Sequence, residues 1–452
     1  MNPPSTAPTI SDLAASLRRR ETSASELTVA TLRRIAELNP ALNAFALVDE
    51  SGALQAARAA DAELASGLDR GPLHGVPVAV KDLIDMAGLP TTCGSASAFG
   101  VETATRDAEV VTRLRQAGAV IVGKTTLHEF AYGATGDRSV HGASRNPRDR
   151  RRMSGGSSGG SAVAVGSGMV PLSVGTDTAG SVRVPAALCG VVGLKPAFDA
   201  ISSQGVYPLA PSLDHVGLLA ATTADVAVAY TVLSGGIADD EIPDGPISVG
   251  WVPPSDIAVT DPRIEAKVHL FLTTSGLDLH IVRGLVPQGD QTLFEISSTL
   301  QGLEAFRVHE HHLEHDHETI DPEVLARLRQ GGDITASDYA RADEARQEFR
   351  ATVSNLLETH SLLALPTVPV VAPLLGVRNL RVADVDLEVR AALLSLTSPW
   401  NLTSGPAISL PAGNVDGLPI AVQLVTAPGR ESLLFEVARR LETAKQQVTA
   451  TC

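Results

Sequence analysis

Short aliphatic runs bordered by glycine or proline are the feature that most constrains the fold of this chain. They occupy residues 76–80, 119–122 and 170–174, and they return at 362–371, 407–410 and 420–425. An apolar run of this length between turn residues is typical of a buried strand. Because the runs lie on both sides of a charged, irregular region, the sequence predicts an α/β protein whose two ends complete one sheet.

The predicted organisation is one domain over residues 1–452. It comprises a helical arm (1–70), a core (71–235), a variable and mainly helical insert (243–360) and a C-terminal part that completes the sheet (361–452). In the arm, Ser23 and Glu26 form a capping-box pattern, and Pro40 is expected to end the helix. Further helices are predicted around 338–352 and 431–441.

Charge and cysteine usage exclude several classes of protein. The formal net charge is −15, which disfavours a nucleic acid as partner because its phosphates would be repelled. The three cysteines are far apart and form no CxxC pair, so neither a disulfide framework nor a zinc knuckle is expected. No secretory leader or membrane-spanning apolar stretch is found, and a cytoplasmic protein is the expectation.

Residues 154–161 consist of four glycines and four serines. A flexible linker would not normally lead directly into an aliphatic run such as 162–165. A phosphate-binding loop would end in Gly-Lys-Ser/Thr, which is absent here. The remaining interpretation is a catalytic loop, in which glycines free the backbone and serine hydroxyls act as nucleophile and proton relay.

Several segments together resemble the signature of the amidase signature family. They are Ser-Gly-Gly-Ser-Ser-Gly-Gly-Ser (154–161), Gly-Thr-Asp-Thr-Ala-Gly-Ser (175–181), Cys-Gly-Val-Val-Gly-Leu-Lys-Pro (189–196), Gly-Val-Pro-Val-Ala-Val-Lys-Asp (75–82) and Ser-Leu-Asp-His-Val-Gly (212–217). The resemblance covers nearly the whole chain and is weakest over 243–360. It implies an α/β/α sandwich with a mixed central sheet and an amide-bond hydrolase that needs no cofactor or metal.

The resemblance also implies site residues. Ser181 is the expected nucleophile, Ser157 lies on a cis peptide and relays the proton, and Lys81 is the base. The expected oxyanion hole consists of the backbone N–H groups of Thr178, Ala179, Gly180 and Ser181. The physical chemistry agrees, since a serine hydroxyl must lose its proton to attack, and burial after the run 76–80 lowers the pKa of Lys81.

Three neighbouring residues are assigned supporting roles. Asp177 is expected to hold the loop by accepting backbone hydrogen bonds. Arg183 has two interpretations, a grip on a substrate carboxylate or an ion pair with a carboxylate such as Asp177. Ser158 is a candidate for substrate binding.

The sequence His-Glu-His-His-Leu-Glu-His-Asp-His (309–317) raises the possibility of a metal site, because His311 and His315 have helical spacing. No HExxH motif occurs, and the run is charged, so an exposed helix face is the favoured interpretation. A Ser-His-Asp triad using His215 and Asp214, or His128, is disfavoured because no Gly-x-Ser-x-Gly elbow is present.

The predicted function is hydrolysis of a small or aryl amide, or of a carbamate (urethane), through an acyl-enzyme. One alternative is the glutaminase subunit of a tRNA-dependent amidotransferase, which would require a stable partner. Another is an inactive scaffold on the same fold, which the joint presence of Lys81, Ser157 and Ser181 argues against. A monomer or a homodimer is expected.

Overall fold

The computed structural model describes residues 8–96, 103–236, 242, 247–286, 291–315 and 317–451. Strands are β1 (Phe45–Val48), β2 (Pro77–Lys81), β3 (Val120–Thr125), β4 (Leu172–Asp177), β5 (Val192–Lys195), β6 (His215–Ala220), β7 (Ser248–Trp251), β8 (Asp278–Ile281), β9 (Leu362–Pro366), β10 (Asn379–Val382), β11 (Val385–Glu388), β12 (Ala407–Val415) and β13 (Leu418–Val425). Helices are α1 (Ile10–Arg18), α2 (Ala24–Leu42), α3 (Glu50–Ser66), α4 (Glu109–Gln116), α5 (Gly159–Gly166), α6 (Arg183–Cys189), α7 (Thr223–Ser234), α8 (Pro262–Thr273), α9 (Leu293–His315), α10 (Pro322–Gly332), α11 (Ala336–Thr359), α12 (Val389–Ser395), α13 (Pro399–Leu402) and α14 (Glu431–Thr451).

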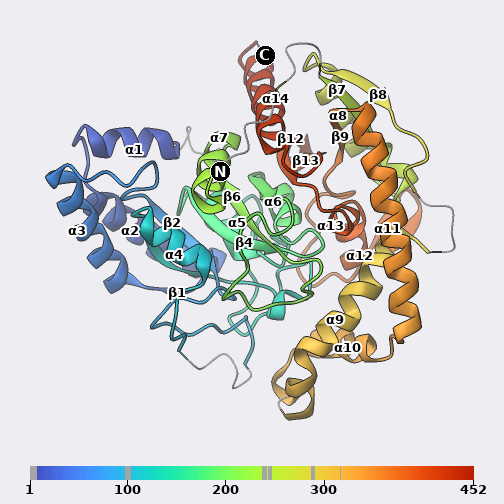
Figure 1. Cartoon of the computed structure of the whole chain (residues 1–452), viewed down its shortest axis with the longest axis horizontal. Helices are drawn as coiled ribbons and strands as arrows, with labels where there is room; N and C mark the ends of the chain where they lie inside the picture. The colour runs from blue at the N-terminus through green and yellow to red at the C-terminus, as the bar shows by residue number, and fades with distance from the viewer. Residues whose placement is uncertain are drawn as a thin grey trace.

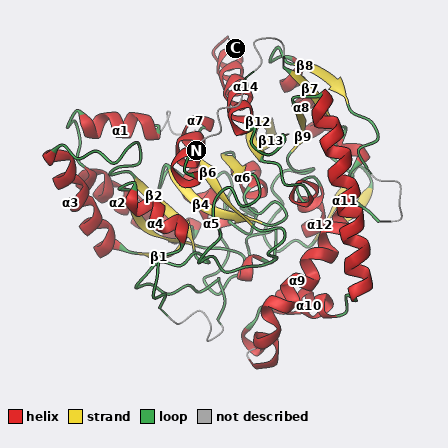
Figure 2. Ribbon diagram, in the orientation of Figure 1, coloured by secondary structure: helices red, strands yellow, loops and turns green. Residues whose placement is uncertain are grey.

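One mixed sheet runs through the molecule (Figures 1 and 2). Within the described residues its strand order is β1-β3-β2-β4-β6-β5-β12-β13-β9-β7-β8, while β10 and β11 form a separate hairpin. The strands β3-β2-β4 and β9-β7-β8 are parallel, whereas the pairs from β4 through β6, β5, β12 and β13 to β9 are antiparallel. Strand β5 from the first half pairs with β12 near the C-terminus, so both ends of the chain lie in the same sheet.

Helices cover both faces of this sheet because its central strands are apolar on both sides. Val78 and Val80 of β2 belong to one buried cluster with residues of α4, α7, α8 and α14, while Ala79 belongs to a second cluster with residues of α2, α3, α5 and α6. Successive side chains of a strand point to opposite faces, which places the two clusters on the two sides of the sheet. The predicted α/β/α arrangement with a mixed sheet is therefore confirmed.

A third buried cluster fills the region between the C-terminal strands and helices α9, α11 and α13. Trp400 and Phe349 lie at its centre, with ring centroids 6.1 Å apart. Figure 1 shows α9, α10, α11 and α12 together on the right of the molecule. No helix among the described residues is long and apolar enough to cross a membrane.

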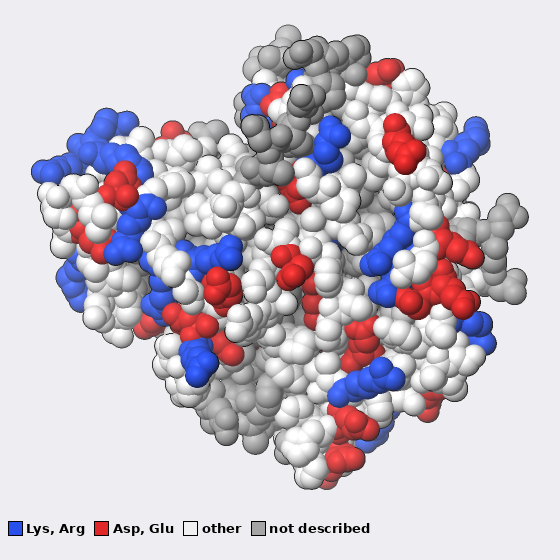
Figure 3. Space-filling view, viewed as in Figure 1, with Lys and Arg blue, Asp and Glu red and all other residues white. Residues whose placement is uncertain are grey.

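One local expectation differs from the structure. Pro40 does not end its helix, because α2 continues to Leu42 and Asn43 then adopts the left-handed conformation that closes it. The insert carries the helices α8, α9, α10 and α11, and it also contributes β7 and β8 to the sheet. The capping box of Ser23 and Glu26 is confirmed. On the face drawn in Figure 3, acidic and basic side chains of the described residues are interspersed.

Candidate active site

Lys81 is the last residue of β2, and its side chain is fully buried. Its Nζ lies 2.7 Å from Ser157 Oγ and 2.7 Å from Thr176 Oγ1. Burial lowers the pKa of Lys81 to about 7, although the negative charges of Asp177 and Asp214 oppose the shift. A buried amine with a pKa of about 7 is neutral in about half of the molecules at pH 7, and the neutral form can accept a proton from a neighbouring hydroxyl.

Ser157 lies in the glycine–serine loop immediately before α5, and its side chain is buried. The Gly156–Ser157 peptide bond is cis, as the resemblance implied. The carbonyl of Ser157 accepts a 3.1 Å hydrogen bond from the backbone N–H of His128. These contacts hold the Ser157 hydroxyl against the amine of Lys81.

Ser181 lies between β4 and α6 and is 5% exposed. Its carbonyl accepts a 3.1 Å hydrogen bond from the backbone N–H of Ser158. The fold thus brings Lys81, the 157–158 segment and Ser181 together, although they are spread over a hundred residues of sequence.

The expected oxyanion hole needs one correction. The N–H of Gly180 donates a 2.9 Å hydrogen bond to Asp177 Oδ1, so it is not available to an oxyanion. In the part of the chain that the structure describes, the N–H groups of Thr178, Ala179 and Ser181 make no hydrogen bond to another residue. Gly180 instead serves the loop through its φ of +128°, and a Cβ there would lie 2.1 Å from Thr397 Oγ1.

Arg183 forms an ion pair with Asp177, the second of its two interpretations. Its Nη2 lies 2.7 Å from Asp177 Oδ1, and neither side chain is exposed. The other N–H groups of the guanidinium donate to Asp177 Oδ2, Thr397 O, Gln423 Oε1 and Asn401 Oδ1. Because all five donors are occupied inside the protein, the possible role of Arg183 in gripping a substrate carboxylate is not supported.

Asp177 has the geometry expected of a support for the loop. It accepts hydrogen bonds from the backbone N–H groups of Gly180 and Val182 and from the Asn401 amide. Burial favours the neutral acid, but the charge and hydrogen bonds of Arg183 outweigh it and hold the pKa of Asp177 below its usual value. The loop that presents Ser181 is therefore fixed by a buried ionised carboxylate.

Ser158 also needs a correction. Its hydroxyl donates to the carbonyl of Thr176 at 3.1 Å and accepts the N–H of Thr176 at 3.2 Å. The side chain is fully buried. Ser158 therefore joins the catalytic loop to β4 and is not placed to bind a substrate.

Two side-chain contacts of the site were not predicted from the sequence. Thr176 shares the Lys81 amine with Ser157, and the hydroxyl of Thr178 donates to Asp214 Oδ1 at 2.6 Å. Burial raises the pKa of Asp214 to about 6, despite the hydrogen bond from Thr178. A cavity of about 80 Å³ adjoins these residues, lined by Thr176, Thr178, Tyr207 and Asp214 among others. Thr176 and Thr178 both lie in the motif of residues 175–181 that ends with Ser181. Membership of this motif was the one indication in the sequence that they belong to the site.

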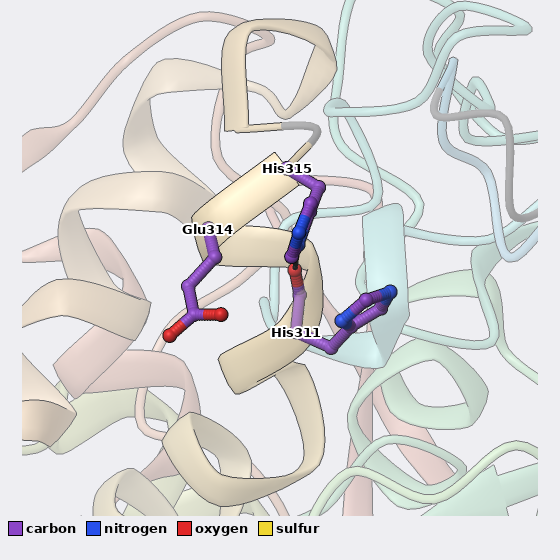
Figure 4. A group of neighbouring side chains, drawn as sticks. All are labelled: His311, Glu314 and His315. Atoms are coloured by element: carbon purple, nitrogen blue, oxygen red, sulfur yellow. Dashed lines mark hydrogen bonds between the residues drawn. The ribbon is translucent and has the colours of Figure 1, made fainter.

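The histidines of the segment 309–317 differ in their exposure to solvent. His311, Glu314 and His315 at the end of α9 are exposed, and their ligand atoms lie within 4.8 Å of one another (Figure 4). His309, in contrast, is buried, with its ring centroid 4.4 Å from that of Phe130. The expectation of an exposed face is therefore wrong for His309, because the face of α9 that carries it packs on the core.

Comparisons with known proteins agree with this fold. A family model described as Amidase matches residues 26–260 and 287–435. The chain is 35% identical to one subunit of the glutamyl-tRNA(Gln) amidotransferase of Acidothermus cellulolyticus (97% of this chain, 94% of the relative). It is 34% identical to the AtzE subunit of the 1-carboxybiuret hydrolase of a Pseudomonas species (93% and 95%). A crystal structure of an amidase superposes with a TM-score of 0.90 at 33% identity, covering 96% of this chain and 99% of the other.

The chain therefore belongs to the amidase family, the amidase signature hydrolases of carbon–nitrogen bonds. Because that family assignment covers most of the chain, the chain is an enzyme of the amidase type.

Proposed function

We propose that this enzyme hydrolyses a small or aryl amide, or a carbamate, through an acyl-enzyme on Ser181. Ser181 attacks the carbonyl carbon while its proton passes through Ser157 to Lys81. Backbone N–H groups of Thr178, Ala179 and Ser181 stabilise the oxyanion of the tetrahedral intermediate. The proton then passes to the leaving nitrogen as the carbon–nitrogen bond breaks, and water hydrolyses the resulting ester.

The observation that carries the proposal is the contact between Lys81 and Ser157. A buried amine 2.7 Å from a serine hydroxyl, with a pKa of about 7, has the position and the basicity of a general base. A scaffold without catalysis would gain nothing from such a group, since burying an amine is unfavourable.

The test is hydrolysis of a panel of p-nitroanilides, aliphatic amides, glutamine and aryl carbamates. We expect the purified wild type to cleave at least one class, and Ser181→Ala and Lys81→Ala to lose at least about a hundredfold in kcat/KM. The preferred member of the panel then separates an amidase from a urethanase. Full activity in Ser181→Ala would refute the proposed nucleophile.

The second candidate is a glutaminase subunit of a tRNA-dependent amidotransferase. The similarity to one subunit of such enzymes over nearly the full chain favours it. It predicts a preference for glutamine within the panel and a stable partner protein that co-purifies with the chain. A purified chain that hydrolyses simple amides well and glutamine poorly, without a partner, would exclude it.

A further inference from the structure

Three side chains that can bind a metal ion lie close together near the end of α9. They are His311, Glu314 and His315, and one ligand atom of each lies within 4.8 Å of the ligand atoms of the other two (Figure 4). On a helix, spacings of three and four residues place Glu314 and His315 about one turn after His311. All three are exposed, and none belongs to the proposed catalytic machinery. We name these three residues the α9 cluster.

The two imidazole rings of the α9 cluster are adjacent. Their centroids lie 4.3 Å apart, with an angle of 38° between the ring planes. Nδ1 of His315 lies 2.9 Å from the carbonyl oxygen of His311. Because a carbonyl can only accept a hydrogen bond, Nδ1 carries the proton, and the lone pair of neutral His315 is on Nε2. A hydrogen bond of this kind to the backbone commonly orients a metal-binding histidine.

The remaining ligand atoms of the α9 cluster have no protein partner in the part of the chain that the structure describes. The ring nitrogens of His311 make no hydrogen bond there, and the Glu314 carboxylate makes neither a hydrogen bond nor an ion pair. Ligand atoms around a tetrahedral zinc ion are about 3.3 Å apart. Because the three side chains are exposed, they can rotate to close the remaining distance without displacing packed neighbours.

A second pair of histidines, His280 and His360, is already engaged within the protein. Their ring centroids lie 5.7 Å apart. Nε2 of His280 lies 3.0 Å from Asp278 Oδ2, and Nδ1 of His360 lies 3.1 Å from the hydroxyl oxygen of Ser248. The α9 cluster differs from this pair because its rings are closer together and its carboxylate is open to a ligand.

The charge around the α9 cluster favours a cation. Residues 308–326 include no lysine or arginine and six acidic residues, which are Glu310, Glu314, Asp316, Glu318, Asp321 and Glu323. The C-terminal end of a helix also carries a partial negative charge, and α9 ends at His315. Imidazole nitrogens with a carboxylate oxygen suit zinc, nickel and copper, whereas magnesium and calcium prefer oxygen ligands.

We propose that the α9 cluster binds one late first-row divalent metal ion, such as Zn²⁺. Nε2 of His315, one ring nitrogen of His311 and one carboxylate oxygen of Glu314 supply three ligands, and solvent supplies the rest. The ion links successive turns of α9 and so stabilises the end of the helix, from which the chain passes to η4 (His317–Thr319). This inference goes beyond the hydrolytic function proposed above and does not depend on it.

Calorimetric titration with Zn²⁺ tests the proposal. The protein is purified without a polyhistidine tag and is freed of metal with a chelator. We expect the tightest binding event of the wild type to involve one Zn²⁺ per chain. His311→Gln and His315→Gln should each raise the Kd of this event at least about tenfold. Glu314→Gln should raise it by a smaller factor, because an amide oxygen is a weaker ligand than a carboxylate.

A matched control is His280→Gln, which removes an exposed histidine with a carboxylate neighbour from a different part of the surface. It should leave the Kd unchanged. The proposal is overturned if the variant that carries both His311→Gln and His315→Gln binds Zn²⁺ as tightly as the wild type. It is also overturned if Mg²⁺ at equal concentration displaces the Zn²⁺, because attraction to carboxylates alone would then explain the binding.

Thermal unfolding gives a second readout that needs no substrate. An ion that binds only the folded protein raises its stability, so Zn²⁺ at about one hundred times its Kd should raise the Tm of the wild type by about 2–4 °C. A chelator should reverse this rise, and the variant with both histidines replaced should shift by less than about 0.5 °C. Equal shifts in the two proteins would place the ion elsewhere and contradict the proposal. Failure of the proposed hydrolysis would leave both results unaffected.

Discussion

At the scale of single residues, the basicity of Lys81 depends on the residues that bury its amine. An aliphatic run followed by lysine predicted a buried amine, and the structure places that amine against Ser157 and Thr176. The glycine–serine motif identified Ser157 as a partner of this amine but did not identify Thr176. It could not identify Thr397, Asn401 and Gln423, which reach Arg183 from more than two hundred residues away.

The proposed role of Lys81 as the base predicts the pH dependence of the reaction. Protonated Lys81 cannot accept the serine proton, and its pKa is about 7, so kcat/KM should rise with pH up to about 7 and level off above it. The profile is measured with a substrate that does not titrate in this range. Lys81→Met should lower kcat/KM by about a hundredfold to ten thousandfold and abolish the inflection. An inflection that persists in Lys81→Met would assign it to another group.

Arg183→Met tests the structural role of the buried ion pair. It would leave the Asp177 carboxylate buried without its countercharge, so we expect a loss of about 3–5 kcal/mol in the free energy of unfolding. Chemical denaturation measures the loss. Arg381→Gln, at an exposed pair, should change stability by less than about 1 kcal/mol. A small loss in Arg183→Met would show that the pair is not needed to fix the loop.

At the scale of elements, the aliphatic runs predicted several of the buried strands, but they did not predict β5 and β6, which are also buried at every position. Strands β2, β3, β4, β12 and β13 coincide with aliphatic runs. Strand β8 lies at the edge of the sheet with mostly exposed residues, so it has no apolar run to reveal it. Pro40 was misleading because a proline in the last turn removes one backbone hydrogen bond but does not prevent the helix from continuing to Leu42.

The contact between α9 and α10 depends on glycine. A Cβ on Gly331 would lie 2.2 Å from the carbonyl oxygen of Gly302, so the two helices touch through their backbones. Gly331→Ala should therefore destabilise the protein by about 1–3 kcal/mol, although alanine ordinarily favours a helix over glycine.

Thermal and chemical unfolding measure this effect, with Gln330→Ala as the control at an exposed position of the same helix. That variant should stay within about 0.5 kcal/mol of the wild type. If Gly331→Ala instead raises the free energy of unfolding, α9 and α10 can move apart without destabilising the protein.

At the scale of the whole molecule, the sheet joins segments from both halves of the chain. Strand β5 pairs with β12, and Asp177 and Arg183 take partners from the segment after α12. The prediction of one domain rested on the return of aliphatic runs near the C-terminus. Pairing order could not be predicted, because it depends on contacts between residues far apart in sequence.

A fragment of residues 1–360 tests this organisation. It lacks β9, β12 and β13, so β5 would expose an unpaired apolar edge, and we expect the fragment to aggregate when it is produced alone. Co-production with residues 361–452 should restore soluble protein. A monomeric 1–360 fragment with a cooperative thermal transition would instead divide the chain into two domains.

Covalent trapping of the nucleophile tests the assignment of Ser181 most directly. A serine-reactive aryl phosphonate should add one group to the wild type in intact-protein mass spectrometry, and peptide mapping should place it on Ser181. Ser181→Ala should remain unlabelled, and Lys81→Met should label at least about a hundredfold more slowly, because the hydroxyl would lack its base. A group attached elsewhere, or equal labelling of Ser181→Ala, would contradict the account.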